Sequence, residues 1–537
     1  MIEFRGVRGA AGIAIGPIAR YQPVAASDAA PFSVRRERAV AYLRGLSARL
    51  HEQGLPDEAA IFDAQVLLVA DPALEAAVAA HEQAGAPVAM AIRTAIDELA
   101  APLEGLDDPY LRERAADIRA AGAALLGGEQ PLQLPPDAIL LATELTPAET
   151  VNLPLRSVGG LGTVKGSPTS HTAILARSLG IPAVLGLDPE ALAWPEGTRA
   201  ILDGEAGVLI LEPDRATQAY YEQLKLERRD AVAGHTAQRE LPTETSDGRR
   251  IAVWANIGSL EEVEAALRAG AEGIGLLRTE FLFLQRAAPP GEDEQVDVYT
   301  AVLHGLAGRP VVARTLDVGG DKPLPYLPAL SEPNPFLGER GIRFSQRFPE
   351  LFRTQLRALL RAAYHGDLRI MLPMVATAAD LAWAHDQMQG AADDLRAAGI
   401  DFRAEVPLGI MVETPAAALM ADRLASRAAF FSIGSNDLAQ YTLAADRTLA
   451  HLAGRYNGDD PAVYRLIAMT VAAARTRGIP VGICGELAGD PAAAVALLGL
   501  GVDELSMAPG SIGAVKARIR ATTFADAEDA ARRACER

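Results

Sequence analysis

Short apolar runs alternate with longer amphipathic stretches over the second half of the chain. Each run is followed by a polar or glycine-rich turn. Runs this short indicate strands buried on both faces, and the stretches between them have helical periodicity. The runs fall at 251–257, 273–277, 310–315, 368–373, 408–412, 429–433, 480–483 and 504–507. Eight strand–helix units predict that residues 251–537 form a closed parallel (β/α)8 TIM barrel, with a doubly wound open sheet as the alternative.

The first part of the chain has two interleaved patterns. Residues 1–30 and 128–212 contain short apolar runs separated by glycine-rich turns, which predict the strands of one small α/β domain. Residues 31–127 have spacings typical of buried helix faces, so an inserted all-α subdomain of about four helices is predicted. The N-terminal strands are expected to join a sheet formed later in the chain. Helix starts are indicated by Pro56, Pro72 and Pro109, with Asp71 and Asp108 as caps.

A charged helix and a turn-rich break separate these two parts. Residues 213–250 begin with a proline, continue as a long polar helix to about Gln238 and end in a polar loop. This composition is typical of an interdomain connector. The fold class predicted for the whole chain is therefore α/β multidomain.

Composition narrows the range of functions. The chain has 537 residues, 49% of them hydrophobic, and a formal net charge of -18. That charge argues against nucleic acid as a partner, because a phosphate backbone requires a basic surface. No apolar run is long enough to span a bilayer, so we expect a cytoplasmic protein without membrane contact. The two cysteines, Cys484 and Cys535, are too few for a disulfide framework or a cysteine metal site.

The first chemically distinctive stretch surrounds His171. A Thr-Ser pair precedes it, the run from Thr172 to Leu179 has helical spacing, and Gly180 follows. His171 is therefore expected in the first turn of a helix, where free backbone N–H groups and the helix dipole favour negative charge. A phosphoryl group on the imidazole would be stabilised there, although capping or packing is the commoner use of a lone histidine at such a place.

Polar residues directly follow several of the predicted barrel strands. In this fold the carboxyl ends of the strands form the active-site face. Several arginines gathered there, in a protein this acidic, would suit bidentate contacts with phosphate or carboxylate. Glu413 and Asp437, from neighbouring strands, could hold Mg²⁺ through oxygen, with structural ion pairing as an equal alternative. The residues at this face are Arg278, Arg314, Lys322, Arg340, Glu413, Asn436, Asp437, Arg447 and Cys484.

Cys484 stands at the end of the seventh predicted strand, before Gly485 and Glu486. A thiol in this position can act as an acid, as a nucleophile or as a small buried residue, and the last is commonest. The nearby basic cluster is expected to favour the thiolate. An acid–base role is therefore open.

Together these motifs resemble those of Enzyme I of the bacterial sugar phosphotransferase system, the phosphoenolpyruvate–protein phosphotransferase family. Thr-Ser-His-Thr-Ala-Ile at 169–174 is similar to the phosphohistidine motif of that family. The likeness covers nearly the whole chain in collinear order, and so many motifs in sequence are specific. The matching barrel motifs are Gly-Ile-Gly-Leu-Leu-Arg-Thr-Glu, Gly-Gly-Asp-Lys, Val-Glu-Thr-Pro-Ala-Ala, Ser-Asn-Asp-Leu-Ala-Gln-Tyr and Cys-Gly-Glu-Leu-Ala-Gly-Asp.

The resemblance implies a role for each matching residue. His171 would take the phosphoryl group of phosphoenolpyruvate on Nε2, with Thr150 hydrogen-bonded to the other ring nitrogen. Cys484 would protonate the enolate carbon to give pyruvate. The substrate phosphate would be held by Arg278, Arg314, Arg340, Lys322 and Asn436, its carboxylate by Arg447, and Mg²⁺ by Glu413 and Asp437.

The resemblance also implies partners and a motion. The helical insert would dock the phosphocarrier protein HPr, whose histidine receives the phosphoryl group, and the barrel would form a homodimer. The domain that carries His171 would swing about the connector. Two departures stand out: Gly166-Ser167-Pro168 replaces the common Gly-Gly-Arg, as in members fused to other phosphotransferase modules, and a final segment common in the family is short or absent before Arg537.

Two other functions remain open. A pyruvate phosphate dikinase or phosphoenolpyruvate synthase shares the phosphohistidine and the barrel, but it needs a nucleotide-binding domain, for which the sequence leaves no room and shows no glycine-rich phosphate loop. A non-catalytic regulatory or docking protein would keep the fold without turnover, although every barrel residue named above is present.

Overall fold

The structure is a computed structural model of the chain. It describes residues 1–21, 30–52, 56–104, 109–126, 134–145, 149, 153–154, 157–166, 171–284, 286, 288–319, 324, 326–327, 332–447, 449, 452 and 455–536. Two compact units, Met1–Arg229 and Asp230–Arg537, make up the chain.

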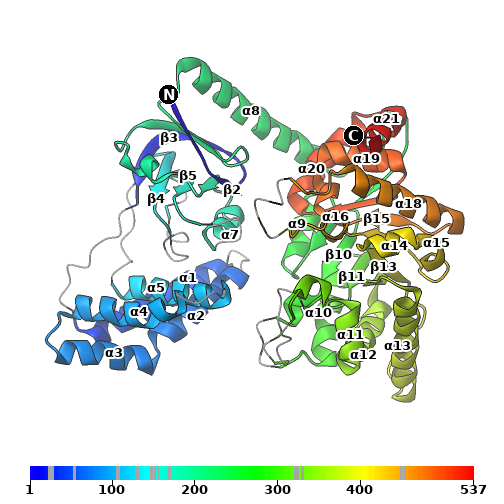
Figure 1. Cartoon of the computed structure of the whole chain (residues 1–537), viewed down its shortest axis with the longest axis horizontal. Helices are drawn as coiled ribbons and strands as arrows, with labels where there is room; N and C mark the ends of the chain where they lie inside the picture. The colour runs from blue at the N-terminus through cyan, green and yellow to red at the C-terminus, as the bar shows by residue number, and fades with distance from the viewer. Residues whose placement is uncertain are drawn as a thin grey trace. The chain divides into compact units, whose positions relative to one another are not determined.

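The first unit contains an eight-stranded mixed sheet (Figure 1), with its strands in the order β1-β8-β7-β3-β4-β5-β6-β2. The N-terminal strands pair with strands far along the chain: β3 lies antiparallel to β7 and parallel to β4. The expectation that they join a later sheet is therefore confirmed. The strands are β1 (Ile2–Arg5), β2 (Val7–Ala10), β3 (Ile13–Arg20), β4 (Ala138–Ala142), β5 (Val158–Thr163), β6 (Ala183–Leu185), β7 (Arg199–Asp203) and β8 (Val208–Leu211).

Five helices, where about four were expected, occupy the described part of the stretch between β3 and β4. They are α1 (Phe32–Glu52), α2 (Pro56–Val69), α3 (Pro72–Gln83), α4 (Val88–Glu104) and α5 (Pro109–Leu125). The predicted starts at Pro56, Pro72 and Pro109 are confirmed, and Asp71 Oδ1 caps α3 by accepting from the Ala73 N–H at 2.8 Å. Asp108 lies outside the described residues. The additional helix is α4, whose start was missed because its proline, Pro87, precedes the first helical residue and accepts from the Met90 and Ala91 N–H groups.

The carboxyl-terminal part of the first unit contains the short helix that begins at the candidate phosphorylation site. This helix, α7 (His171–Ser178), lies next to β2. Gly180 follows it at a φ of +68°, a left-handed conformation that glycine adopts without strain and that ends helices. The predicted helix and its glycine stop are confirmed. The 3-10 helix η1 (Pro189–Ala193) and the long helix α8 (Arg215–Ala237), which continues past Arg229, complete the region.

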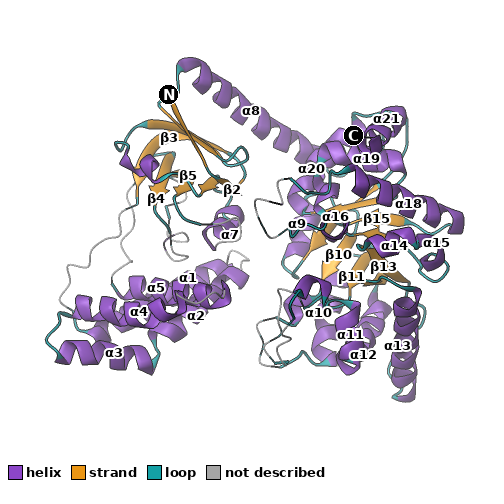
Figure 2. Cartoon of the chain, in the orientation of Figure 1, coloured by secondary structure: helices purple, strands orange, loops and turns teal. Residues whose placement is uncertain are grey.

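The second unit is a closed parallel barrel with its strands in the order β10-β11-β12-β13-β14-β15-β16-β9. Figure 2 shows the strands surrounded by helices. The TIM-barrel prediction is confirmed and the open-sheet alternative is wrong. The strands are β9 (Ala252–Ile257), β10 (Ile274–Arg278), β11 (Val311–Arg314), β12 (Leu368–Leu372), β13 (Leu408–Val412), β14 (Phe431–Ile433), β15 (Val481–Ile483) and β16 (Glu504–Met507).

Two buried layers stabilise the barrel. The larger layer lies between strands and helices, and the smaller one fills the barrel interior with side chains that include Trp254, Met371, Met411 and Cys484. The α-helices are α9 (Glu262–Arg268), α10 (Glu292–Gly305), α11 (Ile342–Arg347), α12 (Pro349–Ala362), α13 (Ala378–Ala397), α14 (Pro415–Leu419), α15 (Ala421–Leu424), α16 (Ser435–Leu443), α18 (Pro461–Arg477), α19 (Pro491–Leu500), α20 (Pro509–Arg520) and α21 (Phe524–Glu536). The 3-10 helices are η2 (Glu280–Leu282), η3 (Pro335–Leu337), η4 (Ala363–His365) and η5 (Glu486–Gly489).

The polar loop that follows α8 is fastened to the barrel. Lys516, with 2% of its surface exposed, donates from Nζ to the backbone oxygens of Arg239 (2.9 Å) and Gly270 (2.6 Å). The Ser246 N–H donates to the Thr522 oxygen at 3.0 Å. The loop therefore belongs to the second unit by its hydrogen bonds.

Candidate functional site

Most of the residues predicted at the active-site face follow barrel strands directly. Arg278 and Arg314 are the last residues of β10 and β11, and Glu413 comes one residue after β13. Asp437 lies in the first turn of α16, just after β14, and Cys484 comes one residue after β15. Because all eight strands run in parallel in a closed barrel, these ends share one rim.

Two arginines and three carboxylates form an alternating ion network at this rim. Arg314 lies 2.8 Å from Glu280 and 3.0 Å from Asp317, each measured from guanidinium nitrogen to carboxylate oxygen. Arg340 lies 3.0 Å from Asp317 and 2.9 Å from Asp437. All five residues expose 7% of their surface or less. Buried charges are tolerated when each has close partners of the opposite sign, and here each arginine has two.

The two buried guanidinium groups remain charged. Burial by itself lowers their pKa, but the neighbouring carboxylates raise the pKa of both Arg314 and Arg340 above the ordinary value. Arg314 Nε is buried, and no described residue accepts its hydrogen bond. A charged N–H donor for which the described residues supply no acceptor is suited to an anionic oxygen.

Glu413 adds a fourth carboxylate, with 1% of its surface exposed. Its Oε1 accepts the Met374 N–H at 2.6 Å. Burial and then the charges of Asp437 and Asp317 raise the pKa of Glu413 to about 8, although Arg340 and Arg314 act in the opposite direction. The rim thus carries more buried carboxylates than arginines. Among the described residues, no group of three or more His, Cys, Asp and Glu side chains could hold a metal ion.

Cys484 is a buried thiol with 3% of its surface exposed. Its Sγ donates to the Ile433 oxygen at 3.7 Å. Burial raises the pKa of Cys484 to about 12, against the smaller opposing effect of the Ser432 hydroxyl. The expectation that the arginine cluster favours the thiolate is therefore wrong, because desolvation outweighs the attraction of Arg314. The thiol holds its proton at neutral pH.

The remaining predicted residues differ in their exposure and in their contacts with the rim. Asn436 joins two loops of the rim, since its Oδ1 accepts the Glu486 N–H at 2.9 Å. Arg278 is exposed at the end of β10. The side chain of Arg447 is 41% exposed and lies 3.8 Å from Asp437 Oδ2. Lys322 lies outside the described residues.

His171 is the first residue of α7, and of its side chain the structure describes nothing. Thr150 lies outside the described residues. The helix itself is attached to the first unit: Thr172 Oγ1 donates to the Leu145 oxygen at 2.9 Å, and Arg177 donates to the Gly9 oxygen at 2.7 Å. The first bond holds the start of the helix, directly after His171, and the second holds its last turn against β2.

Sequence reasoning missed Glu280, Asp317 and Tyr441. Glu280 and Asp317 hold the two buried arginines, and Arg340 also donates to the Tyr441 hydroxyl at 3.4 Å. A signal existed for the first two, because Glu280 comes two residues after Arg278 and Asp317 three residues after Arg314. An acid placed so soon after a strand-end arginine returns to the same rim.

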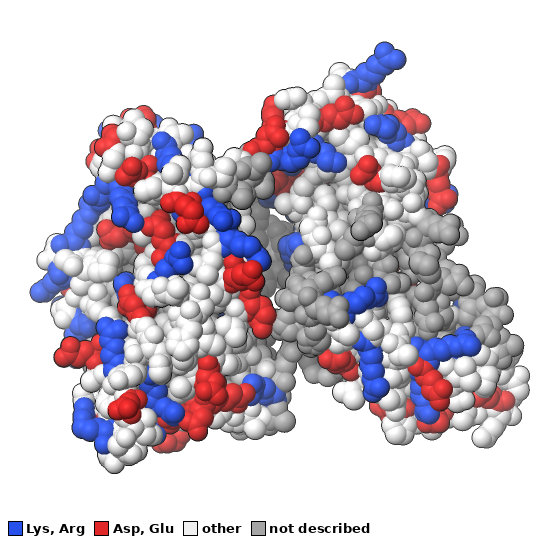
Figure 3. Space-filling view, turned by 180° about the vertical axis from the view of Figure 1, so that it is seen from behind, with Lys and Arg blue, Asp and Glu red and all other residues white. Residues whose placement is uncertain are grey.

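The described surface shows no continuous basic face in the view of Figure 3. There, Lys and Arg are mixed with Asp and Glu. No helix within the described residues has the length and apolar character needed to cross a membrane.

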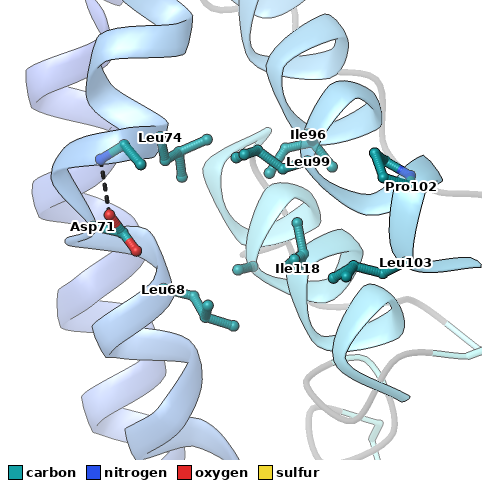
Figure 4. A pocket seen from close by; sticks show the side chains of 10 residues that line it. Leu68, Asp71, Leu74, Ile96, Leu99, Pro102, Leu103 and Ile118 are labelled. Carbon is teal, nitrogen blue, oxygen red and sulfur yellow. Dashed lines mark hydrogen bonds between the residues drawn. The ribbon is translucent and has the colours of Figure 1, made fainter. Parts of the chain in front are cut away.

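A separate apolar pocket lies within the helical bundle of the first unit. Figure 4 shows Leu68 and Leu74 on one wall and Ile96, Leu99 and Ile118 on the other. Its volume is about 270 Å³. Two large apolar side chains of the same bundle face solvent: Leu67 on α2 is 73% exposed and Met90 on α4 is 61% exposed.

Family descriptions match three successive parts of the chain. Residues 5–114 match the N-terminal region of PEP-utilising enzymes. Residues 134–207 match the mobile domain of PEP-utilising enzymes, and residues 232–524 match their PEP-binding domain.

Individual relatives agree with these matches. A multiphosphoryl transfer protein of Rhodobacter capsulatus is 46% identical over 493 residues, which are 89% of this chain and 58% of the relative. The chain thus spans little more than half the length of that relative. A phosphoenolpyruvate-protein phosphotransferase of Haloferax volcanii is 43% identical over 94% of this chain and 89% of the relative. A phosphoenolpyruvate-protein phosphotransferase of Listeria innocua is 39% identical over 95% of this chain and 92% of the relative. The resemblance found in the motifs is confirmed, and the chain belongs to the phosphoenolpyruvate-protein phosphotransferase family of PEP-utilising enzymes.

Proposed function

We propose that the chain transfers the phosphoryl group of phosphoenolpyruvate to its own His171, releases pyruvate, and passes the group to a histidine of the phosphocarrier protein HPr. The observation that carries this proposal is the buried Arg314–Asp317–Arg340 network beside Glu413, in which Arg314 Nε has no acceptor among the described residues. Phosphoryl transfer needs alignment and charge neutralisation more than covalent chemistry, and preorganised guanidinium groups supply both.

Each rim residue has a proposed task. Arg278, Arg314 and Arg340 hold the phosphate of the substrate, with help from Lys322 and Asn436. Arg447, which is the more exposed arginine, holds the substrate carboxylate. Arg340 is paired with Asp437 on both of its terminal nitrogens, at 2.9 Å each, so this pair opens when Arg340 binds phosphate.

The chemical steps balance without an external oxidant or reductant. The neutral imidazole of His171 attacks phosphorus, the N–P bond forms, and the bond from phosphorus to the enol oxygen breaks. The enolate carbon then takes the proton of the Cys484 thiol, which gives pyruvate and a thiolate that water reprotonates. A thiol that stays protonated at neutral pH is suited to this role.

The donor set fits a divalent cation. Glu413 and Asp437 are buried oxygen donors, and the charges of Asp437 and Asp317 raise the pKa of Glu413, a repulsion that a cation would relieve. Such ions commonly take one or two protein carboxylates, with substrate oxygens and water completing the shell. We propose Mg²⁺, held by these two residues. When bound, it would neutralise charge on the phosphate and the enolate oxygen.

The helical bundle is the proposed docking surface for HPr. Its apolar pocket and the exposed Leu67 support this assignment. Leu67→Glu should slow phosphoryl transfer to HPr while leaving the phosphorylation of His171 unchanged. Leu226→Glu, on α8 at 45% exposure, is the matched control and should leave both steps unchanged. Equal transfer rates in the two variants would argue against docking at α2.

Domain roles follow from the same proposal. Residues 1–30 and 128–212 carry His171, residues 31–127 bind the carrier, 213–250 connect, and 251–537 bind substrate. The domain carrying His171 moves between substrate and carrier. The proposed homodimer forms through the barrel. Leu419 on α14 is 57% exposed and Met469 on α18 is 45% exposed, and these two helices pack together. Met420, directly after α14, is 40% exposed. Sedimentation of Leu419→Asp should show more monomer than the unchanged protein.

Labelling with ³²P-phosphoenolpyruvate tests the central claim. The full chain with Mg²⁺ should take up acid-labile label and release pyruvate, and His171→Ala should take up none. His81→Gln, on α3 and only 28% exposed, controls for loss of a histidine elsewhere in the unit. Label on His171→Ala equal to that on the unchanged protein would refute the proposal.

Two outcomes would favour the other functions considered. Label from γ-³²P-ATP on His171 would indicate a dikinase or synthase. Binding of HPr without pyruvate release, with Mg²⁺ and a matched carrier present, would indicate a regulatory protein.

A further inference from the structure

A side chain inside the barrel holds the backbone of Cys484 in place. Asn256, near the end of β9, donates from Nδ2 to the Cys484 oxygen at 2.9 Å and to the Ser506 oxygen at 3.3 Å. The Ser506 hydroxyl donates to Asn256 Oδ1 at 2.6 Å. The two carbonyls can only accept, so the NH₂ group must face them and the orientation of the amide is determined. One side chain thus joins β9, β16 and the end of β15.

A glycine on the neighbouring strand β10 leaves space for these side chains inside the barrel. A Cβ atom at Gly275 of β10 would lie 2.5 Å from Ser506 Oγ and 2.2 Å from Glu504 Oε1. The absence of a side chain at this position therefore leaves room for both groups. Ser506 is fully buried, and within the described residues Glu504 Oε1 has no hydrogen-bond partner. Burying polar side chains such as Ser506 and Glu504 costs folding free energy. Their presence inside the barrel therefore indicates a role other than packing.

We propose that Asn256 is a positioning residue for the Cys484 thiol, and that Ser506 holds Asn256 in the required orientation. The inference rests on the proposed function, in which Cys484 gives its proton to the enolate. In that step the S–H bond breaks, a C–H bond forms at C3, and the enolate becomes the ketone pyruvate. Water then reprotonates the thiolate.

Cys484 must be held in place because the direction of proton transfer to the enolate carbon depends on the position of the thiol. The enolate carbon is planar, so a fixed thiol reaches one face only. A displacement of about 1 Å costs roughly a hundredfold in rate for such steps. Cys484 is the residue directly after β15, and its carbonyl is held by Asn256 instead of a neighbouring strand. Without that bond Cys484 keeps the contacts of its N–H and Sγ with the Ile433 oxygen but loses the fixed orientation of its carbonyl. The thiol then shifts from its position, and the enolate meets solvent protons on either face.

The stereochemistry of the pyruvate methyl group measures this positioning. Phosphoenolpyruvate with one tritium at a defined position on C3 is turned over in D₂O by the full chain with Mg²⁺ and HPr. One-sided delivery then gives a methyl group of single chirality. The variants are Asn256→Asp, which keeps the size but loses the donor, Ser506→Ala, and Ser506→Thr, which keeps the hydroxyl. Thr470→Ala is the matched control, because Thr470 is also fully buried but donates within α18 to the Leu466 oxygen.

Asn256→Asp should lose most of the chirality, with KM for phosphoenolpyruvate and the extent of His171 labelling within about twofold of the unchanged protein. Ser506→Ala should lose part of it, and Ser506→Thr should retain it. If Asn256→Asp does not fold, the two serine variants carry the test. Full chirality in Asn256→Asp or in Ser506→Ala overturns the inference, as does a loss that Thr470→Ala reproduces.

Cys484→Ala separates this inference from the proposed function. If Cys484→Ala still yields a single chirality, the thiol is not the proton donor and that part of the proposed function fails, together with this inference. If Cys484→Ala loses chirality while Asn256→Asp keeps it, only the positioning role is wrong.

Discussion

Replacing Asp317 with asparagine removes one negative charge from the middle of the rim network without changing the size of the side chain. Asp317 pairs with both buried arginines, at 3.0 Å each. Breaking a buried pair costs about 3–5 kcal/mol, and here each arginine keeps one other carboxylate, Glu280 or Asp437. We therefore expect the lower end of that range, about 3 kcal/mol. Because Arg314 and Arg340 lose a fixed partner, KM for phosphoenolpyruvate should also rise.

The loss is large enough to measure by calorimetry on the full chain. An unfolding unit of about 300 residues has an unfolding entropy of about 0.6 kcal/mol/K, so 3 kcal/mol lowers its Tm by about 5 °C. Tryptophan fluorescence recorded during heating helps to assign each calorimetric transition, because Trp254 and Trp383 lie in the second unit and Trp194 lies in the first. Only the transition of the second unit should move.

Asp393→Asn is the matched control. Asp393 pairs with Arg396 on α13, and both side chains are more than half exposed. Such pairs contribute at most about 1 kcal/mol, which corresponds to a shift under about 2 °C. If Asp317→Asn shifts the transition no more than Asp393→Asn, the buried network does not contribute to stability in the way argued.

Three further changes test other parts of the structure. Burial raises the pKa of Glu504 to about 8, above about 4.3 in the unfolded chain, so the folded state binds the extra proton and stability should fall as pH rises between these values. Chemical unfolding of Glu504→Gln should show a shallower fall, by up to about 1.4 kcal/mol per pH unit. Lys516→Met leaves the Arg239 and Gly270 oxygens without their donor and should lower the Tm of the second unit, at about 1–3 kcal/mol for each oxygen that stays buried; an unchanged Tm would contradict this. Glu413→Gln should raise the Mg²⁺ concentration for half-maximal pyruvate formation by more than about tenfold, and chelation should stop pyruvate formation by the unchanged protein.

The positions of Arg314, Glu413, Asp437 and Cys484 could be predicted because a parallel barrel converts strand ends into a rim. Once the strands are recognised from their apolar runs, the residue after each strand must face that rim. This prediction requires only the ends of the strands in the sequence and no distance between the residues. The same rule placed Asn436 at the rim, where its Oδ1 accepts the Glu486 N–H.

The charge balance of the rim could not be predicted in the same way. Arg340 and Asp437 are 97 residues apart, and their contact depends on how a loop folds over the barrel. The protonation of Cys484 was misjudged for a related reason. Sequence shows which charges are nearby in the fold, but desolvation depends on how completely neighbouring side chains exclude water.

A contribution to stability does not explain why Arg314 and Arg340 are buried, but a role in substrate binding does. Apolar residues of similar volume would often stabilise such a site equally well, since desolvation offsets much of the attraction in a buried ion pair. An exposed arginine must lose roughly 2 kcal/mol of rotamer entropy when it binds phosphate. Arg314 and Arg340 have lost that freedom already, because Glu280 and Asp317 still hold them when the Arg340–Asp437 pair opens. These two carboxylates thus make the arginines rigid before substrate arrives, and Asp437, once released by Arg340, can hold the proposed cation beside the phosphate.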